Sequence, residues 1–357
     1  MPDTMPLAAA LRHALKVNRW LIALALLEAG SALALSVAYG LPYSNRTFQS
    51  MVNLLTVLTP VYLLVLLIWT VAGLALAEPR ARPIPRLLQS LRATLGDLPR
   101  MASGAVALFS VTFFFSGFTY IKSVIPDVVP FGWDVTLANL DRAIHGGVDA
   151  HRLLGPLFDT PLATTAVNAA YHFWFFLLYF FVFVACFTGA NPAARQRFLI
   201  SFPLVWGLGG SLAALVFSSA GPCYYQLVGL GDRFVPLMQK LQTFAETSPV
   251  WALDVQAALW VGYNQETAIR GISAFPSMHV ASSTLMMLHA FTWRRWAGWL
   301  MLGFLGLILV GSVHLGWHYA VDGYAAIALT VAIWAVVGRL LEGRARTPEA
   351  ASQPAAM

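Results

Sequence analysis

Three side chains toward the carboxyl end of the chain have types and spacing suited to acid–base or nucleophilic chemistry. His318 and Asp322 are four positions apart, and His279 lies in a separate segment upstream. On a helix, residues i and i+4 share one face, so the carboxylate would fix the tautomer of the imidazole and raise the basicity of its far nitrogen. We therefore expect Asp322 to orient His318 as a catalytic base or nucleophile.

The second histidine follows a predicted helix start. Pro276 and Ser277 are typical of the first turn and the N-cap of a helix, whose free backbone N–H groups favour an anion. His279, in the first turn, would reach that anion from one side and His318 from the other. One imidazole could attack phosphorus while the other protonates the departing alkoxide, so the pattern predicts phosphoryl transfer.

The composition indicates which elements must position these residues. Hydrophobic residues make up 58% of the 357 residues and charged residues only 11%, with a mean hydropathy of +0.68. Soluble proteins of this length carry far more charge, so we predict an all-α, polytopic membrane bundle. The apolar runs indicate about eight transmembrane helices, at roughly 20–41, 54–76, 101–121, 166–188, 198–217, 277–293, 296–313 and 319–341.

Charged residues predict the orientation of these spans. Basic residues gather before the first span, in the 77–100 loop, in alternate later loops and after the last span. By the positive-inside rule these segments and both termini are cytoplasmic. The 122–165 loop has three basic against five acidic residues and, with 218–276 and 314–318, falls on the other side. We therefore expect an active site on the extracytoplasmic face of a bacterial inner (plasma) membrane.

This topology divides the chain into three parts. Residues 1–100 would form a cytoplasmic tail, two extra spans and a basic loop, residues 101–341 a six-helix catalytic membrane domain, and residues 342–357 a disordered cytoplasmic tail. Because the basic residues lie in short loops and not on one exposed face, we exclude nucleic acid as a partner. Cys186 and Cys223 fall toward opposite ends of the bilayer, so we predict no disulfide between them.

Other polar and aromatic features have structural interpretations. The aromatic run from Tyr171 to Phe180 is most simply a lipid-facing or packed helix surface. Asp134 and Asp141 belong to a polar cluster that we interpret as a loop network. Glu28, an acid inside the first span, is interpreted as a helix contact.

The two histidine segments together resemble a known family. Pro276-Ser277-Met278-His279, followed by Ser312, His318 and Asp322, is similar to the second and third signature motifs of the type 2 phosphatidic acid phosphatase superfamily. These motifs usually read Pro-Ser-Gly-His and then Ser-Arg, five residues, His, three residues, Asp. The flanking residues look more like the branch of inositol phosphorylceramide synthases and related lipid phosphotransferases, namely Ala274-Phe275, His318-Tyr319, Lys122-Ser-Val-Ile-Pro126, Phe131-Gly-Trp-Asp134 and Leu140-Asp-Arg-Ala-Ile-His-Gly-Gly147.

The resemblance covers roughly residues 101–341 and implies a role for each matching position. His318 would be the nucleophile that forms a phosphohistidine, Asp322 its orienting partner, and His279 the general acid that later serves as base. Ser277 and the Met278 amide would hold phosphate oxygens. The implied activity is the inositolphosphotransferase-like transfer of a phosphoryl or phospho-head-group from a phospholipid or a polyprenyl or sphingolipid phosphoester in the bilayer.

One departure from the family pattern removes a phosphate-binding cation. The arginine expected after Ser312 is Val313 in this chain. We expect His314 or Arg270 to replace it.

A second departure concerns the first family motif, which usually has a lysine some way before an Arg-Pro pair. Here Gly221-Pro222 follows the fifth span with no lysine at that distance. Lys122, from the end of another span on the same face, could supply the charge. Lys122 and Arg270 are therefore the candidate cationic clamps.

Two other functions stay open. Water as acceptor would make the protein a lipid phosphate or isoprenoid pyrophosphate phosphatase, because acceptor choice depends on the shape and wetness of the cavity. The valine at 313 also leaves open a catalytically silent lipid transporter or scaffold. We disfavour a metal site of His279, His314, His318 and Asp322, because an anion site at a helix start needs no metal and the His-Glu-x-x-His pattern is absent. No metal or cofactor is expected, and the oligomeric state is left open.

Overall fold

Long apolar runs fold as helices in this chain because each backbone polar group inside a bilayer must be paired within its own segment. The computed structural model describes residues 5–77, 83–265 and 270–350, and no strand occurs among them. The predicted all-α, polytopic membrane bundle is confirmed. Within these ranges, six segments are long and apolar enough to cross a membrane: α2 (Arg19–Tyr39), α5 (Leu98–Val128), α8 (Pro161–Phe187), Pro192–Val216, α14 (Arg295–His314) and the Ala320–Gly343 part of α15 (Ala320–Ala350).

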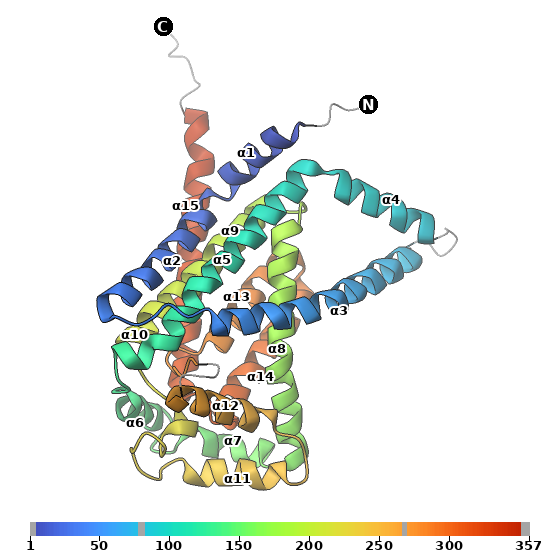
Figure 1. The fold of residues 1–357 in the computed structure, drawn as a ribbon. Helices are drawn as coiled ribbons and strands as arrows, with labels where there is room; N and C mark the ends of the chain where they lie inside the picture. The colour runs from blue at the N-terminus through green and yellow to red at the C-terminus, as the bar shows by residue number, and fades with distance from the viewer. Residues whose placement is uncertain (1–4, 78–82, 266–269, 351–357) are drawn as a thin grey trace.

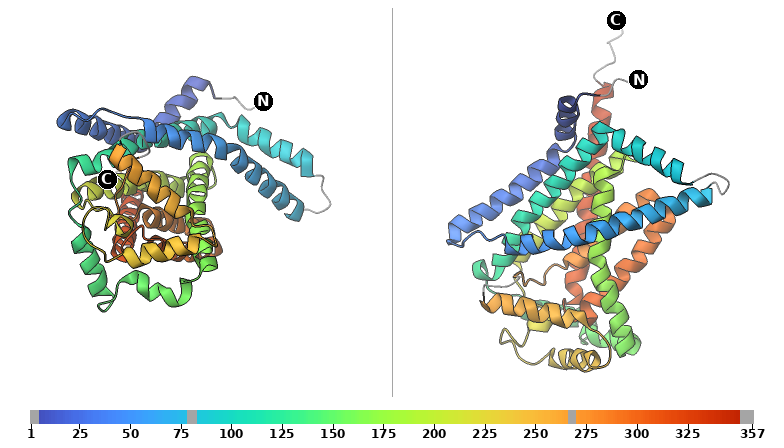
Figure 2. Two further views of the ribbon diagram at one scale, coloured as in Figure 1. Left: turned by 60° about the horizontal axis from the view of Figure 1, so that its bottom comes forward. Right: turned by 45° about the vertical axis from the view of Figure 1, so that its right-hand side comes forward.

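Two of the eight predicted spans differ from these six. α13 (Met278–Trp293) has only 16 residues. It packs against α8, α9 (Pro192–Val205), α14 and α15, and a helix enclosed by protein need not match the thickness of the lipid. α3 (Arg46–Ala77) crosses the outside of the bundle obliquely (Figure 1; Figure 2), and its apolar stretch within the described residues is the shorter Thr59–Gly73. Both segments are helical as predicted.

Short helices from the two long loops form a layer at one end of the bundle. This end lies opposite α1 (Leu7–Val17) and the carboxyl end of α15 (Figure 1). The loops predicted to share one side of the membrane therefore lie together, next to the start of α13 and the end of α14. The layer contains α6 (Asp134–Ile144), α7 (Ala150–Phe158), η2 (Pro222–Tyr224), α11 (Val235–Ala245) and α12 (Trp251–Gln265).

The predicted loop and tail at the domain edges contain more helix than expected. α4 (Pro83–Gly96) occupies much of the predicted basic loop, of which residues 78–82 lie outside the described residues. α15 continues to Ala350, past the predicted boundary at 342, although the segment includes Gly343 and Pro348, which are poor helix formers. Residues 351–357 of the predicted disordered tail also lie outside the described residues.

The fifth predicted span changes its helical type midway. α9 is followed by a π-helical turn, η1 (Trp206–Ala213), and by α10 (Ala214–Val216). Within η1, the Ser211 hydroxyl donates a hydrogen bond to the buried Glu28 carboxylate of α2. A buried acid inside a membrane needs such a partner, so the predicted helix contact of Glu28 is made with the π-helical turn.

The packing of α2 on α5 is closest at Gly117. A Cβ added there would lie 3.0 Å from backbone atoms of Glu28 and Ala29, so the two helices meet backbone to backbone. We expect Gly117→Val to destabilise the protein by about 1–3 kcal/mol, the usual cost of overpacking. Gly30→Val is the matched control on α2, because a Cβ there meets no heavy atom within 4 Å. Thermal unfolding in detergent measures both variants, and equal melting temperatures would contradict the close approach.

Candidate active site

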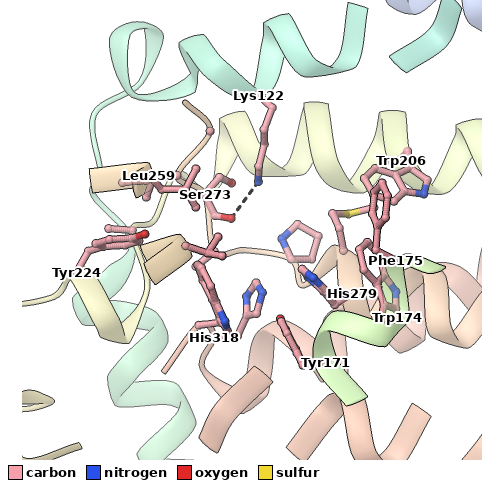
Figure 3. Close-up of a pocket in the computed structure, with 18 of the residues that line it drawn as sticks. Lys122, Tyr171, Trp174, Phe175, Trp206, Tyr224, Leu259, Ser273, His279 and His318 are labelled. Atoms are coloured by element: carbon pink, nitrogen blue, oxygen red, sulfur yellow. Dashed lines mark hydrogen bonds between the residues drawn. The ribbon is translucent and has the colours of Figure 1, made fainter. Parts of the chain in front are cut away.

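A cavity of about 460 Å³ lies where α5, α8 and the start of α13 meet the layer of short helices (Figure 3). Its wall is mostly aromatic and aliphatic, with few ionisable side chains. His279 and His318 both line this cavity, although 39 positions separate them in the chain. The structure therefore brings the two predicted catalytic histidines to one site.

His318 and Asp322 form the predicted pair at the start of α15. His318 Nδ1 lies 3.4 Å from Asp322 Oδ2, and the same carboxylate oxygen accepts a hydrogen bond from the Tyr319 backbone N–H at 3.1 Å. Asp322 is fully buried. Because Nδ1 faces the carboxylate, Nε2 is the ring nitrogen left for a ligand. A separation of 3.4 Å is long for a hydrogen bond, and catalytic contacts often shorten in the substrate complex.

His279 occupies the first turn of α13 and is held by two aromatic rings of α8. Its centroid lies 4.3 Å from that of Tyr171, in a stacked arrangement, and 4.0 Å from that of Trp174. The centroids of His279 and His318 are 6.5 Å apart, with ring planes inclined at 61°. The two imidazoles are too distant to bond to each other and close enough to contact one group held between them.

Backbone hydrogen bonds join the two histidine segments. The Ser277 N–H donates to the Asp322 carbonyl oxygen at 3.2 Å. The Ser277 hydroxyl accepts a hydrogen bond from the Val280 N–H at 3.5 Å, so Ser277 is the N-cap of α13 that the sequence indicates. Ser277 is fully buried and does not line the cavity, whereas Met278 does. Of these two predicted phosphate ligands, only Met278 lies at the cavity wall.

Lys122 brings a cation to the cavity from the end of α5. Its Nζ donates a hydrogen bond to the Ser273 carbonyl oxygen at 2.9 Å (Figure 3). Its stem passes Gly271, which has a φ of 137°, and a Cβ there would lie 3.2 Å from Lys122 Cγ. Glycine therefore suits position 271 both by conformation and by space. The Ser273 carbonyl engages one of the three donors of the ammonium, so the others can reach phosphate oxygens.

Arg270 and His314, the predicted substitutes for the missing arginine, do not line the cavity. Arg270 forms an ion pair with Asp127 at 3.1 Å. His314 Nε2 is hydrogen-bonded to the Thr164 hydroxyl at 2.9 Å. Val313 packs in a small buried apolar cluster. The structure thus places Lys122, and neither substitute, at the cavity wall.

Four lining side chains that were not predicted to belong to the site have buried polar atoms without a partner among the described residues. They are the hydroxyls of Tyr171 and Ser273 and the indole N–H groups of Trp206 and Trp317. Buried donors are normally paired, and each of these could donate to a phosphate or hydroxyl oxygen. For Tyr171, the available sequence signal was its i, i+3 spacing from Trp174, a neighbouring cavity residue. This spacing puts both rings on one face of α8.

A carboxylate of α6 fixes the loop that carries His318. Asp134 accepts hydrogen bonds from the Ala220 and Gly221 N–H groups, both at 2.8 Å, and from the Tyr319 hydroxyl at 2.9 Å. Burial and the charge of Asp134 raise the pKa of Tyr319, so its hydroxyl stays protonated and donates. Gly221 has a φ of 96°, and a Cβ there would lie 2.6 Å from the Trp317 carbonyl oxygen. Asp134 therefore joins two loops beside the cavity, as the predicted loop network requires.

We expect Asp134→Asn to lower stability and turnover together. The amide cannot accept all three hydrogen bonds, so at least one buried donor loses its partner at a cost of about 1–3 kcal/mol. Tyr319→Phe, which removes one donor and keeps the carboxylate, is the milder comparison. Melting temperature in detergent and turnover report on both variants. An Asp134→Asn protein as stable as the native chain would show that the carboxylate does not hold the loops.

The assembled groups define the chemistry that the cavity can support. They are an imidazole oriented by a carboxylate, a second imidazole, a lysine and several neutral donors, which suit transfer of a group with anionic oxygens. In the described ranges, no group of three or more His, Cys, Asp or Glu side chains is placed to hold a metal ion.

Comparison with known proteins identifies the family. The PAP2 superfamily matches residues 135–336, which is more than half of the chain and includes both histidine segments. No curated protein and no solved structure matched the chain. The six apolar segments indicate an integral membrane protein, and the family indicates a phosphatase or phosphotransferase that acts on lipid phosphoesters. The chain belongs to the PAP2 superfamily.

Proposed function

We propose that the protein transfers a phosphoryl or phospho-head-group from a lipid phosphoester to a hydroxyl acceptor through a phosphohistidine. The observation that carries this proposal is the convergence of His318, backed by Asp322, and His279 on one cavity, with the two ring centroids 6.5 Å apart. The resemblance to inositol phosphorylceramide synthases supports a hydroxyl as the acceptor.

In the first step, Nε2 of neutral His318 attacks the phosphorus atom of the donor. As the N–P bond forms, the bond to the leaving alkoxide breaks, and protonated His279 gives its proton to that oxygen. The Asp322 carboxylate stabilises the positive charge that develops on the His318 ring. Lys122 and the neutral donors around the cavity stabilise the charge on the remaining phosphate oxygens.

In the second step, now-neutral His279 takes the proton of the acceptor hydroxyl while the acceptor oxygen attacks phosphorus. The N–P bond breaks, His318 returns to its neutral form, and His279 is protonated for the next cycle. An alcohol at this step gives transfer, whereas water gives hydrolysis. The mostly aromatic and aliphatic wall limits water around the phosphohistidine, which favours an alcohol.

The side of the membrane follows from the predicted topology. The cavity lies at the end of the bundle opposite α1 and the carboxyl end of α15. Cytoplasmic termini, which the positive-inside rule predicts, would put the reaction on the extracytoplasmic face of a bacterial inner membrane.

Lipid mass spectrometry of proteoliposomes tests the proposal. The vesicles would contain phosphatidylinositol as a phosphodiester donor, with and without ceramide as a hydroxyl acceptor. Formation of a new phosphodiester lipid, with one diacylglycerol released for each product, is the expected result. Release of free phosphate from phosphatidic acid or undecaprenyl pyrophosphate without an acceptor would establish the hydrolytic alternative. Consumption of none of these lipids would favour a transporter or scaffold.

A further inference from the structure

A second, smaller cavity lies beside the histidine cavity, between α5 and α8. Its volume is about 170 Å³, and α9 and η1 form its floor. Four aromatic residues line both cavities, and we call them the junction residues: Phe118, Trp174, Phe175 and Trp206. The two spaces therefore meet at these rings. We call the second space the α5–α8 groove.

Beyond the junction residues, the groove has an apolar wall whose hydroxyls are already engaged. Thr112 and Thr119 donate hydrogen bonds to carbonyl oxygens of their own helix at 2.9 Å and 2.8 Å. The Tyr179 hydroxyl is hydrogen-bonded to the Thr59 hydroxyl of α3 at 2.8 Å. The histidine cavity, by contrast, contains buried donors without a partner among the described residues. One space is thus suited to a polar group and the adjoining one to hydrocarbon.

The groove has the length of one membrane leaflet. Along α5 it extends from Thr119 to Leu108, and along α8 from Trp174 to Val182. At 1.5 Å per residue these helix segments are about 17 Å and about 12 Å long. Half of a hydrocarbon core about 30 Å thick is about 15 Å. Because α5 and α8 both qualify as membrane spans, a chain in the groove would lie at the depth of the lipid tails.

α3 covers part of the groove on its outer side. It packs against α5 and passes in front of α8 (Figure 1; Figure 2, right), and the Thr59 hydroxyl is hydrogen-bonded to that of the groove residue Tyr179. A hydrocarbon chain in the groove would therefore be held between protein surfaces and separated, at this level, from the surrounding lipid. Through the contact between Thr59 and Tyr179, α3 would lie beside the bound substrate, although it is one of the two helices outside the predicted six-helix domain.

We propose that the α5–α8 groove binds one hydrocarbon chain of the lipid substrate while its phosphoester lies between His279 and His318. The inference rests on the proposed function, which places a lipid phosphoester in the cavity. Lipid tails are as apolar as the groove wall, so moving a tail from bilayer to groove gains little hydrophobic free energy. The groove instead fixes the depth and direction of the tail, and so places the phosphorus atom at the histidines.

A substitution that fills the groove tests this role, because it should change the preference of the enzyme for long acyl chains. Thr112→Trp puts a bulky ring into the groove, and Phe109→Trp is the matched control, because Phe109 is on the same helix and 72% exposed. The readout is the ratio of kcat/KM for dioleoyl phosphatidylinositol to that for dihexanoyl phosphatidylinositol, each with ceramide as the acceptor. We expect Thr112→Trp to lower this ratio by at least about tenfold, because only the long-chain substrate is misplaced. We expect Phe109→Trp to keep the native ratio. An unchanged ratio in Thr112→Trp would overturn the proposal.

Photolabelling tests occupancy without any need for turnover. The probe is phosphatidic acid with a diazirine near the end of one acyl chain, and the protein is the full-length His318→Gln variant in vesicles. We expect labelled peptides from residues 108–119 of α5 and 175–182 of α8, and less label after Thr112→Trp. Label confined to other helices would overturn the proposed role of the groove, even if the native enzyme is active. Label in the groove of a protein that consumes no phosphoester would support the groove and refute the proposed function.

Discussion

His318→Gln is expected to abolish turnover, with a loss of about 10⁴- to 10⁶-fold in kcat, the effect of removing a covalent nucleophile. Glutamine keeps a polar side chain of similar reach but has no nitrogen that can attack phosphorus. Nδ1 of the native ring faces the carboxylate of Asp322, 3.4 Å from Oδ2, so Nε2 is the atom that would carry the phosphoryl group. The measurement is trapping of a ³²P-labelled phosphoenzyme that is labile in acid and stable in alkali, as a phosphohistidine is.

A third histidine of the same cavity provides the control for this experiment. His172 lines the cavity, but its Nδ1 is hydrogen-bonded to the Asn168 carbonyl oxygen at 2.8 Å and not to a carboxylate. His172→Gln should therefore still form the phosphoenzyme. Label that persists in His318→Gln and disappears in His172→Gln would move the nucleophile to His172 and refute the assignment.

The His318 and Asp322 pair could be predicted because its geometry is local. His318 lies two residues before α15 begins at Ala320, and Asp322 is in its first turn, so a few residues of chain keep the two side chains close. The position of His279 could be predicted only up to its place at a helix start. Its approach to His318 depends on the packing of α13 against α15, which includes the backbone hydrogen bond from Ser277 to Asp322. The alternation of charge between the loops predicts that both segments lie on one side of the membrane.

The sequence mostly did not specify which distant residue each side chain contacts in the folded protein. Arg270 could have reached the cavity but pairs with Asp127, a contact between segments 143 positions apart. Tyr171 and Trp174 lie in an aromatic run, and aromatic residues of a span have the same composition whether they face lipid or a catalytic imidazole. Apolar composition also does not fix the length of a helix, and α13, predicted as a span, has only 16 residues and is enclosed by neighbouring helices.

His279→Gln is expected to lower kcat for a lipid phosphoester by about 10²- to 10⁴-fold, the usual contribution of a general acid or base. The loss should depend on the leaving group. An alkoxide needs a proton as it departs, whereas p-nitrophenolate does not. With p-nitrophenyl phosphate, the first step should therefore proceed in His279→Gln, and the second step should stall because no base activates the acceptor. The expected result is a burst of one nitrophenolate per active site followed by slow turnover.

The burst separates acid–base catalysis from a structural role of His279. The centroid of the His279 ring lies 4.3 Å from that of Tyr171 and 4.0 Å from that of Trp174. Loss of the ring could therefore also disturb the packing of α8 on α13. A packing defect would slow both substrates alike and would give no burst, because His318 would no longer be presented to phosphorus. Trp174→Phe, which keeps an aromatic ring beside His279 and removes the hydrogen bond from Trp174 Nε1 to Ser282, shows the size of such a defect. Equal losses for both leaving groups in His279→Gln, matched by Trp174→Phe, would mean that His279 organises the cavity and that another group moves the proton.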